Sequence, residues 1–167
     1  MNALIENRRS IRKFQPSKPV TKEQLKELLS AAMAAPSARN SRPWEFIAVT
    51  GRKILNEIML IHPHAKMLET AAAAIIVVAV PQAGISDDYF QQDCAAATEN
   101  ILLEAVSLGL GTCWCGIHPN KDRTASFRKL LSIPESKIPF NVIAVGVPDE
   151  NPAQKGFFEE SKVSFME

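Results

Sequence analysis

Residues 74–80, Ala-Ile-Ile-Val-Val-Ala-Val, lie in the longest apolar run of the chain and decide its fold class. The stretch does not alternate between apolar and polar residues, which is typical of a strand buried on both faces of a sheet. The whole run, residues 71–80, has ten residues and is too short to cross a bilayer as a helix. We therefore predict a buried strand with a short lead-in, and no association with a membrane.

The segments on either side of this strand have mostly helical patterns. Residues 88–108 are apolar on most sides of a helix, so we expect this helix in the core or at a subunit contact. Thr21 and Gln24 form a capping-box pattern that begins another helix, and Pro36 ends it. Helices are expected over residues 3–9, 22–35, 52–60, 66–70, 88–108 and 121–131, and strands over residues 44–50, 74–80, 112–116 and 140–147. Helices outnumber strands, which predicts an α/β or α+β domain around one central sheet.

Residues 1–167 are expected to form a single domain that ends in an extended tail, residues 148–167. The tail is charged, but Phe157, Phe158, Val163 and Phe165 are apolar. We therefore expect it to pair at a sheet edge or to wrap a neighbouring subunit.

The composition, with 46% hydrophobic and 22% charged residues, is that of an ordinary soluble protein. The net charge of +1 argues against broad nucleic-acid binding, which needs a basic face. Three cysteines, with no export signal in the first twenty residues, indicate a reducing compartment, and we expect the cytoplasm.

The stretch Arg8-Arg9-Ser10-Ile11-Arg12-Lys13-Phe14 concentrates four cations on this balanced background. One interpretation is that Arg8 and Arg9 offset the dipole at the end of the first helix. The other is a phosphate clamp, because guanidinium groups match phosphate oxygens and a hydroxyl adds a neutral donor. Charge alone leaves both open.

Metal and redox interpretations are disfavoured. Cys113, Cys115 and His118 include three possible ligands, but zinc sites usually need a second pair elsewhere, and a strand would place both thiols on one buried face. The chain has no C-x-x-C sequence. His62 and His64 flank a proline in a predicted surface loop and are expected to be solvated. We predict no metal site.

Other motifs are missing from the sequence. It has no G-x-S-x-G elbow, no G-x-G-x-x-G after a strand and no P-loop. Three further segments remain: the proline-bounded loop 36–44, the glycine-rich segment 109–116, and Lys155. Each also has a purely structural interpretation. In the loop, Trp44 could simply fill an apolar gap in the core. The glycines could form a helix C-cap, and Lys155 could be a solvated surface charge.

Together these segments resemble the nitroreductase family of FMN-dependent oxidoreductases. The resemblance rests on Arg-Arg-Ser-Ile-Arg-Lys-Phe at 8–14, Ala-Pro-Ser-Ala-Arg-Asn-Ser-Arg-Pro-Trp at 35–44 and Gly-Leu-Gly-Thr-Cys-Trp-Cys-Gly at 109–116. It covers nearly the whole chain, in the compact form of the family. It implies an α+β three-layer sandwich with a central mixed sheet flanked by helices. It also implies an intertwined homodimer with two flavins at the interface.

The resemblance also implies which residues hold FMN. Arg8 would contact the phosphate, Arg12 would lie by the N1/O2 edge of the ring, and the loop with Asn40 would come from the other subunit. The full set is Arg8, Arg9, Ser10, Arg12, Pro36, Ser37, Ala38, Asn40, Cys113, Trp114, Cys115, Gly116 and Lys155. Lys155 stands where the family usually has an arginine, and Arg42 where it commonly has a glutamine.

The activity implied is hydride transfer from NAD(P)H through flavin N5 to a planar small-molecule acceptor such as a nitroaromatic or a quinone. Because the cofactor supplies this chemistry, no protein acid, base or nucleophile is expected. The alternative is an FMN-binding storage or sensor protein with little turnover. A third reading, dehalogenation or flavin destruction, would need lid segments for which the short chain has little room. The acceptor, the choice between NADH and NADPH, oxygen sensitivity, and the roles of Arg42, Cys113 and Cys115 stay open.

Overall fold

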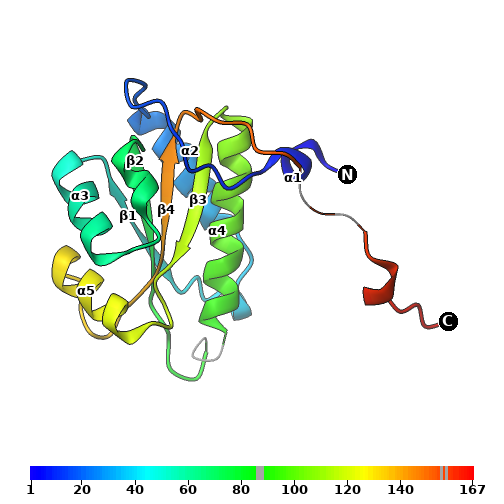
Figure 1. The fold of residues 1–167 in the computed structure, drawn as a ribbon. Helices are drawn as coiled ribbons and strands as arrows, with labels where there is room; N and C mark the ends of the chain where they lie inside the picture. The colour runs from blue at the N-terminus through cyan, green and yellow to red at the C-terminus, as the bar shows by residue number, and fades with distance from the viewer. Residues whose placement is uncertain (86–88, 155, 157) are drawn as a thin grey trace.

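The fold is built on a four-stranded antiparallel sheet with the order β1-β2-β4-β3 (Figure 1). The computed structural model describes residues 1–85, 89–154, 156 and 158–167. The strands are β1 (Trp44–Val49), β2 (Ala73–Ala79), β3 (Gly111–Gly116) and β4 (Ile138–Gly146). Every residue of β2 is buried, which confirms the central strand predicted from the apolar run.

The expected mixed sheet is wrong in one respect, because all pairings among the four strands are antiparallel. Among the described residues, parallel pairing is limited to an isolated bridge between Ser10 and Thr112, where the Ile11 amide donates to the Thr112 carbonyl at 2.8 Å. The N-terminal segment then leaves β3, because Phe14 bridges to Pro148 instead. It therefore runs along the sheet edge without becoming a fifth strand.

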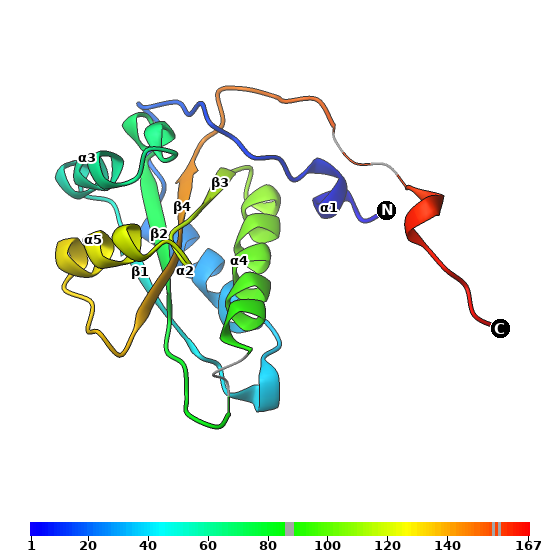
Figure 2. The same ribbon diagram turned by 60° about the horizontal axis from the view of Figure 1, so that its bottom comes forward.

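Helices cover both faces of the sheet and complete the predicted three layers (Figures 1 and 2). One face packs against α2 (Lys22–Met33) and α4 (Phe90–Ser107). The other packs against α3 (Arg52–Ile61), the 3-10 turn η2 (Lys66–Glu69) and α5 (Lys121–Leu131). The remaining elements are α1 (Ala3–Asn7) and the 3-10 turns η1 (Ala38–Asn40) and η3 (Glu160–Lys162).

Alternate residues of β2 serve the two cores. Ile75 and Val77 join the cluster under α2 and α4, while Ile76 and Val78 join the cluster under α3 and α5. This follows from the two-residue side-chain period of a strand. Because both faces are covered by helices, both sets of side chains have to be apolar.

Side-chain caps hold the starts of three helices, and one of them is the capping box predicted from the sequence. Asn2 accepts from the Leu4 amide, Thr21 and Gln24 form a complete capping box, and Asn120 accepts from the Arg123 amide. The first helix ends at Asn7, two residues earlier than expected. Arg8 is therefore extended, and the basic residues leave the helix axis.

The tail runs away from the sheet and its helices (Figures 1 and 2). Phe158 is 71% exposed and Phe165 is 87% exposed, so these apolar side chains are not buried by their own chain. Phe157 and Lys155 lie outside the described residues. The expectation that the tail packs on a neighbouring subunit stays a prediction.

Among the described residues, no helix has the length and apolar character needed to cross a membrane.

Candidate functional site

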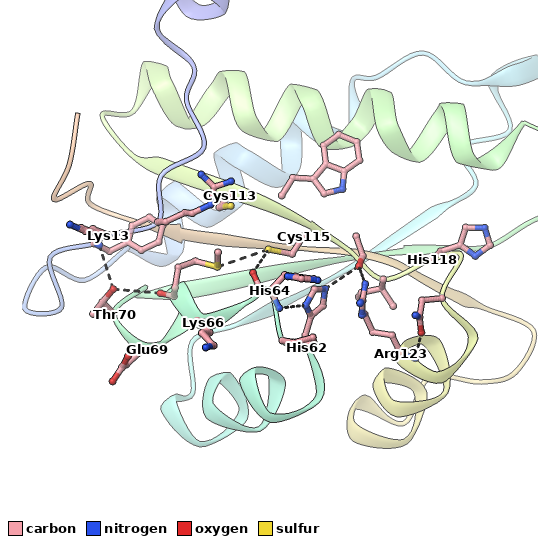
Figure 3. A pocket seen from close by; sticks show the side chains of 18 of the residues that line it. Lys13, His62, His64, Lys66, Glu69, Thr70, Cys113, Cys115, His118 and Arg123 are labelled. Atoms are coloured by element: carbon pink, nitrogen blue, oxygen red, sulfur yellow. Dashed lines mark hydrogen bonds between the residues drawn. The ribbon is translucent and has the colours of Figure 1, made fainter. Parts of the chain in front are cut away.

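A groove of about 1040 Å³ opens beside β3, on the face of the sheet that carries α3 and α5 (Figure 3). Its walls are residues 113–116 of β3, residues 62–70 between α3 and β2, residues 12–16 near the N-terminus, and residues 117–123 at the start of α5. Segments far apart in sequence therefore meet at one edge strand.

The groove is positively charged. Arg12, Lys13, Lys66 and Arg123 line it, against Glu69 and Asp149. This excess of cations favours an anionic ligand.

The β3 wall divides its side chains between two faces. Cys113 and Cys115 face the core under α3 and α5, and both line the groove. Trp114 also contributes to the lining, and its ring lies 6.4 Å from that of Phe140. As expected from the strand spacing, both thiols are buried together on one face.

The two thiols of the wall influence each other's ionisation. Contact with the Cys115 thiol lowers the pKa of Cys113 to about 7, and the Arg12 charge contributes to the lowering. The same contact, together with burial, raises the pKa of Cys115. On the other face of the sheet, burial raises the pKa of Cys94 to about 12. Cys113 is thus the thiol that ionises first.

Two side chains hold the end of the wall by the Gly116 carbonyl. His62 donates to it through Nε2 at 3.0 Å, and Arg123 donates through Nη1 at 2.6 Å. The His64 amide donates to His62 Nδ1 at 3.3 Å, which leaves the ring proton on Nε2. Burial lowers the pKa of His62, so the ring stays neutral.

The expectation that His62 is solvated is wrong, because the side chain is 1% exposed. Its ring packs edge-on against Phe127, with centroids 6.1 Å apart. The physical reason is visible in the sequence: Leu55, Ile58 and His62 follow helical spacing and share the buried face of α3. His64, in contrast, is exposed as expected.

The basic stretch at 8–14 contributes to two neighbouring cavities. Arg12 lines the groove and also a smaller cavity of about 310 Å³, which Arg8, Arg9 and Ser10 line as well. Arg12 and Lys13 donate their backbone amides to Glu150 Oε1. Arg12 therefore stands where the two cavities adjoin.

Both interpretations of this stretch find support in the contacts. Arg9 donates through Nη1 to the Glu6 carbonyl at 2.7 Å, as a cation at a helix end does, but its Nε is buried without a partner among the described residues. Arg8 forms an ion pair with Glu99 on α4, with 3.6 Å between Arg8 Nε and Glu99 Oε1, and its side chain is partly exposed. Arg9, which lines the smaller cavity, thus keeps one buried donor without a partner among the described residues.

The loop with Pro36, Ser37, Ala38 and Asn40 does not line the groove. The Ala38 amide donates to Asp93 Oδ1 at 3.0 Å, at the start of α4. Figure 2 shows this loop beside one end of α4 and α1 beside the other. α4 has 18 residues and is about 27 Å long. The loop lies at the start of α4, and within one chain it lines neither the groove nor the smaller cavity.

The loop is nevertheless sharply bent. Arg39, Asn40 and Arg42 have φ values of 52°, 53° and 48°. Arg42 donates its amide to Ser37 Oγ at 2.9 Å and its Nε to Asn40 Oδ1 at 3.2 Å. These bonds hold Asn40 in a defined position at the surface.

Several groove residues were not singled out from the sequence. Lys66, Met67 and Arg123 line the groove but belong to no motif. Lys66 and Met67 are carried by η2, and Arg123 by the first turn of α5. Only the packing of these elements beside β3 brings the three residues together, and no sequence pattern shows it. For His62, in contrast, helical periodicity was a usable signal of burial.

Comparison with known proteins gives consistent matches. The family model for the nitroreductase family matches residues 5–69 and 60–147. A protein of Methanothermobacter thermautotrophicus, provisionally named NADH dehydrogenase/NAD(P)H nitroreductase, is 44% identical over 159 residues, which are 95% of this chain and 83% of the relative.

Solved structures agree with the sequence matches. A Parabacteroides distasonis protein with the same provisional name has a TM-score of 0.90 and 39% identity, and the match covers 97% of this chain and 95% of that protein. An FMN-dependent nitroreductase from Clostridium difficile R20291 has a TM-score of 0.90 and 29% identity, with coverages of 99% and 98%.

Proposed function

The chain belongs to the nitroreductase family, and from this premise we propose that it is an FMN-dependent oxidoreductase that uses NAD(P)H to reduce a planar small molecule, such as a nitroaromatic or a quinone. Its similarity to a protein named NAD(P)H nitroreductase and to one named FMN-dependent nitroreductase supports the cofactor and the reductant.

The observation that carries the proposal is the pair of adjoining cavities joined at Arg12. The groove is large enough for a flat ring system, since small-molecule sites are commonly about 300–1,000 Å³. The smaller cavity has Arg8, Arg9 and Ser10, and the buried Arg9 Nε is an unused donor. A ligand with a ring at one end and a phosphate at the other fits this arrangement, and FMN is such a ligand.

The proposed roles of the protein groups follow from their positions. Bound FMN would supply the redox chemistry, accepting hydride at N5 and passing the electrons on. Arg12 would place positive charge at the ring edge, where negative charge develops on reduction. His62 and Arg123 hold the Gly116 carbonyl and so keep the β3 wall in position. No side chain is needed as an acid or a base.

We further propose that a second copy of the chain completes the site. The loop with Asn40 is held in a defined shape and lines neither the groove nor the smaller cavity of its own chain. The exposed Phe158 and Phe165 give the tail an apolar surface for the same partner. A homodimer in which each loop reaches the other chain's groove would use both features.

The test is anaerobic reduction of the purified protein. The protein is expected to carry FMN, or to take it up, and to lose its yellow colour when NADH or NADPH is added. A protein that remains colourless after incubation with FMN would contradict the proposal. Bound flavin that neither nicotinamide reduces in a stopped-flow experiment would instead indicate storage or sensing.

A further inference from the structure

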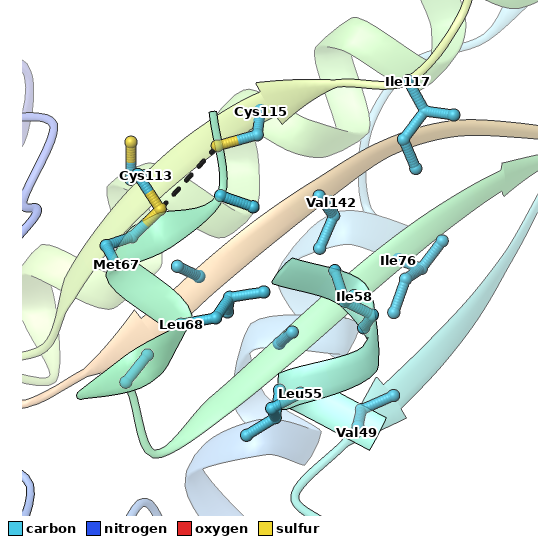
Figure 4. Close-up of a cluster of buried hydrophobic side chains, with 14 of the residues drawn as sticks. Val49, Leu55, Ile58, Met67, Leu68, Ile76, Cys113, Cys115, Ile117 and Val142 are labelled. Carbon is cyan, nitrogen blue, oxygen red and sulfur yellow. Dashed lines mark hydrogen bonds between the residues drawn. The ribbon is translucent and has the colours of Figure 1, made fainter. Parts of the chain in front are cut away.

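We propose that Cys113, Cys115 and Met67 form a binding site for one soft monovalent metal cation, Cu⁺ or Ag⁺. This site goes beyond the proposed oxidoreductase function and does not depend on it, because its ligands are all sulfur atoms of one chain. Figure 4 shows the three side chains together where η2 packs against β3 (Figure 4).

The distance between two of the sulfur atoms suits a three-coordinate site. Cys115 Sγ lies 3.9 Å from Met67 Sδ. With metal–sulfur bonds of about 2.3 Å, the sulfur atoms of a planar trigonal site are about 4.0 Å apart. Cys113 and Cys115 are two residues apart on one face of β3, and their side chains contact each other. A cation bound by Cys115 and Met67 would therefore have the Cys113 thiol beside it as the third ligand.

The chemistry of the donors selects the metal class. Thiolate and thioether ligands favour Cu⁺ over Mg²⁺, Ca²⁺ or Mn²⁺, which prefer oxygen. Among the described residues there is no group of three or more His, Cys, Asp and Glu suited to a metal ion. A structural zinc site usually needs four such ligands, so the sulfur cluster fits a cation of low coordination number.

Binding is a ligand exchange without oxidation or reduction. Two metal–thiolate bonds form, the two S–H bonds break, and both protons go to solvent. Met67 donates a lone pair and loses nothing. The resulting cluster has one net negative charge, and the nearby Arg12 guanidinium, which interacts electrostatically with both sulfur atoms, offsets it.

The surroundings are compatible with both binding and access. Leu68 and Ala71 belong to the same apolar cluster as the three sulfur residues, and this environment keeps water from competing for the cation. All three sulfur residues also line the groove, which opens to solvent. A small cation can therefore reach the site from the groove.

The experiment is anaerobic titration of the full-length protein with Cu⁺ in competition with a coloured Cu⁺ chelator, repeated with Ag⁺ as a cation that does not change oxidation state. Wild type is expected to take up one cation per chain. C113S and C115S are expected to lose this binding. M67L, which keeps both thiols, is expected to bind about tenfold more weakly, the scale on which surrounding groups commonly tune a metal site.

The chain supplies a matched control in Cys94, which is buried on α4 and remote from the groove lining. C94S is expected to bind as wild type does. Equal loss in C94S, or binding retained in the C113S/C115S double variant, would overturn the proposal.

A second measurement keeps the test decisive if a serine variant fails to fold. Alkylation of wild type by iodoacetamide, mapped by mass spectrometry, is expected to slow at Cys113 and Cys115 when Cu⁺ is present. Alkylation of both residues at the same rate with and without the cation would contradict the site.

Discussion

The two faces of the sheet bury comparable apolar clusters but treat their polar groups differently. Under α2 and α4 two buried side chains bond inside the core: Asn141 donates to Thr98 Oγ1 at 2.8 Å, and Thr98 donates to the Cys94 carbonyl at 2.7 Å. Asn141 Oδ1 and Asp93 Oδ2 are buried there without a partner among the described residues. Under α3 and α5, by contrast, Cys113, Cys115 and Arg123 border an open groove.

The difference comes from the lengths of the covering elements. α4 spans one face with 18 residues, while the other face is covered by α3, η2 and α5, which have 10, 4 and 11 residues. Short elements with loops between them leave the edge strand β3 partly uncovered. We therefore expect substitutions on the α4 face to change stability, and substitutions on the groove face to change ligand binding.

The largest effect is expected from Ile101→Ala on the closed face. Ile101 is completely buried on α4, so the change leaves a cavity and should lower the free energy of unfolding by about 2–5 kcal/mol. Urea unfolding measures it. FMN affinity of the folded variant should stay as in wild type; a large loss would show that the two faces are not independent.

Next in size is Arg8→Ala beside the smaller cavity. Loss of one charged hydrogen bond should weaken FMN binding by about 1.5–3 kcal/mol, measured by fluorescence titration. Glu99→Ala is the control, because it removes the ion pair of Arg8 but keeps the guanidinium. Unchanged affinity in the Arg8 variant would reduce Arg8 to a charge that only pairs with α4.

A pH dependence is expected from His62 on the groove face. Its pKa is lowered in the folded protein, so below about pH 6.5 the unfolded chain binds a proton that the native ring does not. Stability should therefore fall as the pH drops through this window towards the folded pKa. His62→Gln keeps a donor without titrating and should show a smaller fall between pH 7.5 and about 5.5. Burial also lowers the pKa of His118. Because His118 is present in both proteins, it contributes equally to both pH profiles. Equal slopes in the two proteins would exclude this role for His62.

The smallest effect on affinity is expected from Arg12→Ala. Removal of the cation at the proposed ring edge should lower the reduction potential of bound FMN, because the reduced form loses its stabilising charge. The potential can be measured by equilibration with reference dyes. Arg12→Lys keeps the positive charge, so its reduction potential should stay close to that of wild type. An unaltered potential in the alanine variant would place Arg12 away from the ring.

The sequence predicted much of the fold because its signals were local. The unbroken run at 74–80 predicted the buried strand, and Thr21 with Gln24 marked a helix start that the structure confirms. The sequence did not show whether the sheet is mixed or fully antiparallel. That depends on whether the segment around Ser10 stays paired in parallel with β3, and it leaves β3 after a single bridge. The burial of His62 was also missed. Its helical spacing from Leu55 and Ile58 predicts a buried side chain, but the proline that follows it suggested a surface loop.

The sequence by itself indicated the family and the three-layer arrangement through the resemblance of its motifs to a known family. It indicated most element boundaries through apolar periodicity and capping, which act over a few residues. The tertiary structure decided which charges share a groove. Lys66, Arg123 and Arg12 are separated by many residues and meet only because η2, α5 and the N-terminal segment pack around β3. It also placed the Asn40 loop at the start of α4, outside the lining of both cavities. Distances of this kind depend on helix length and sheet order, which no local pattern contains.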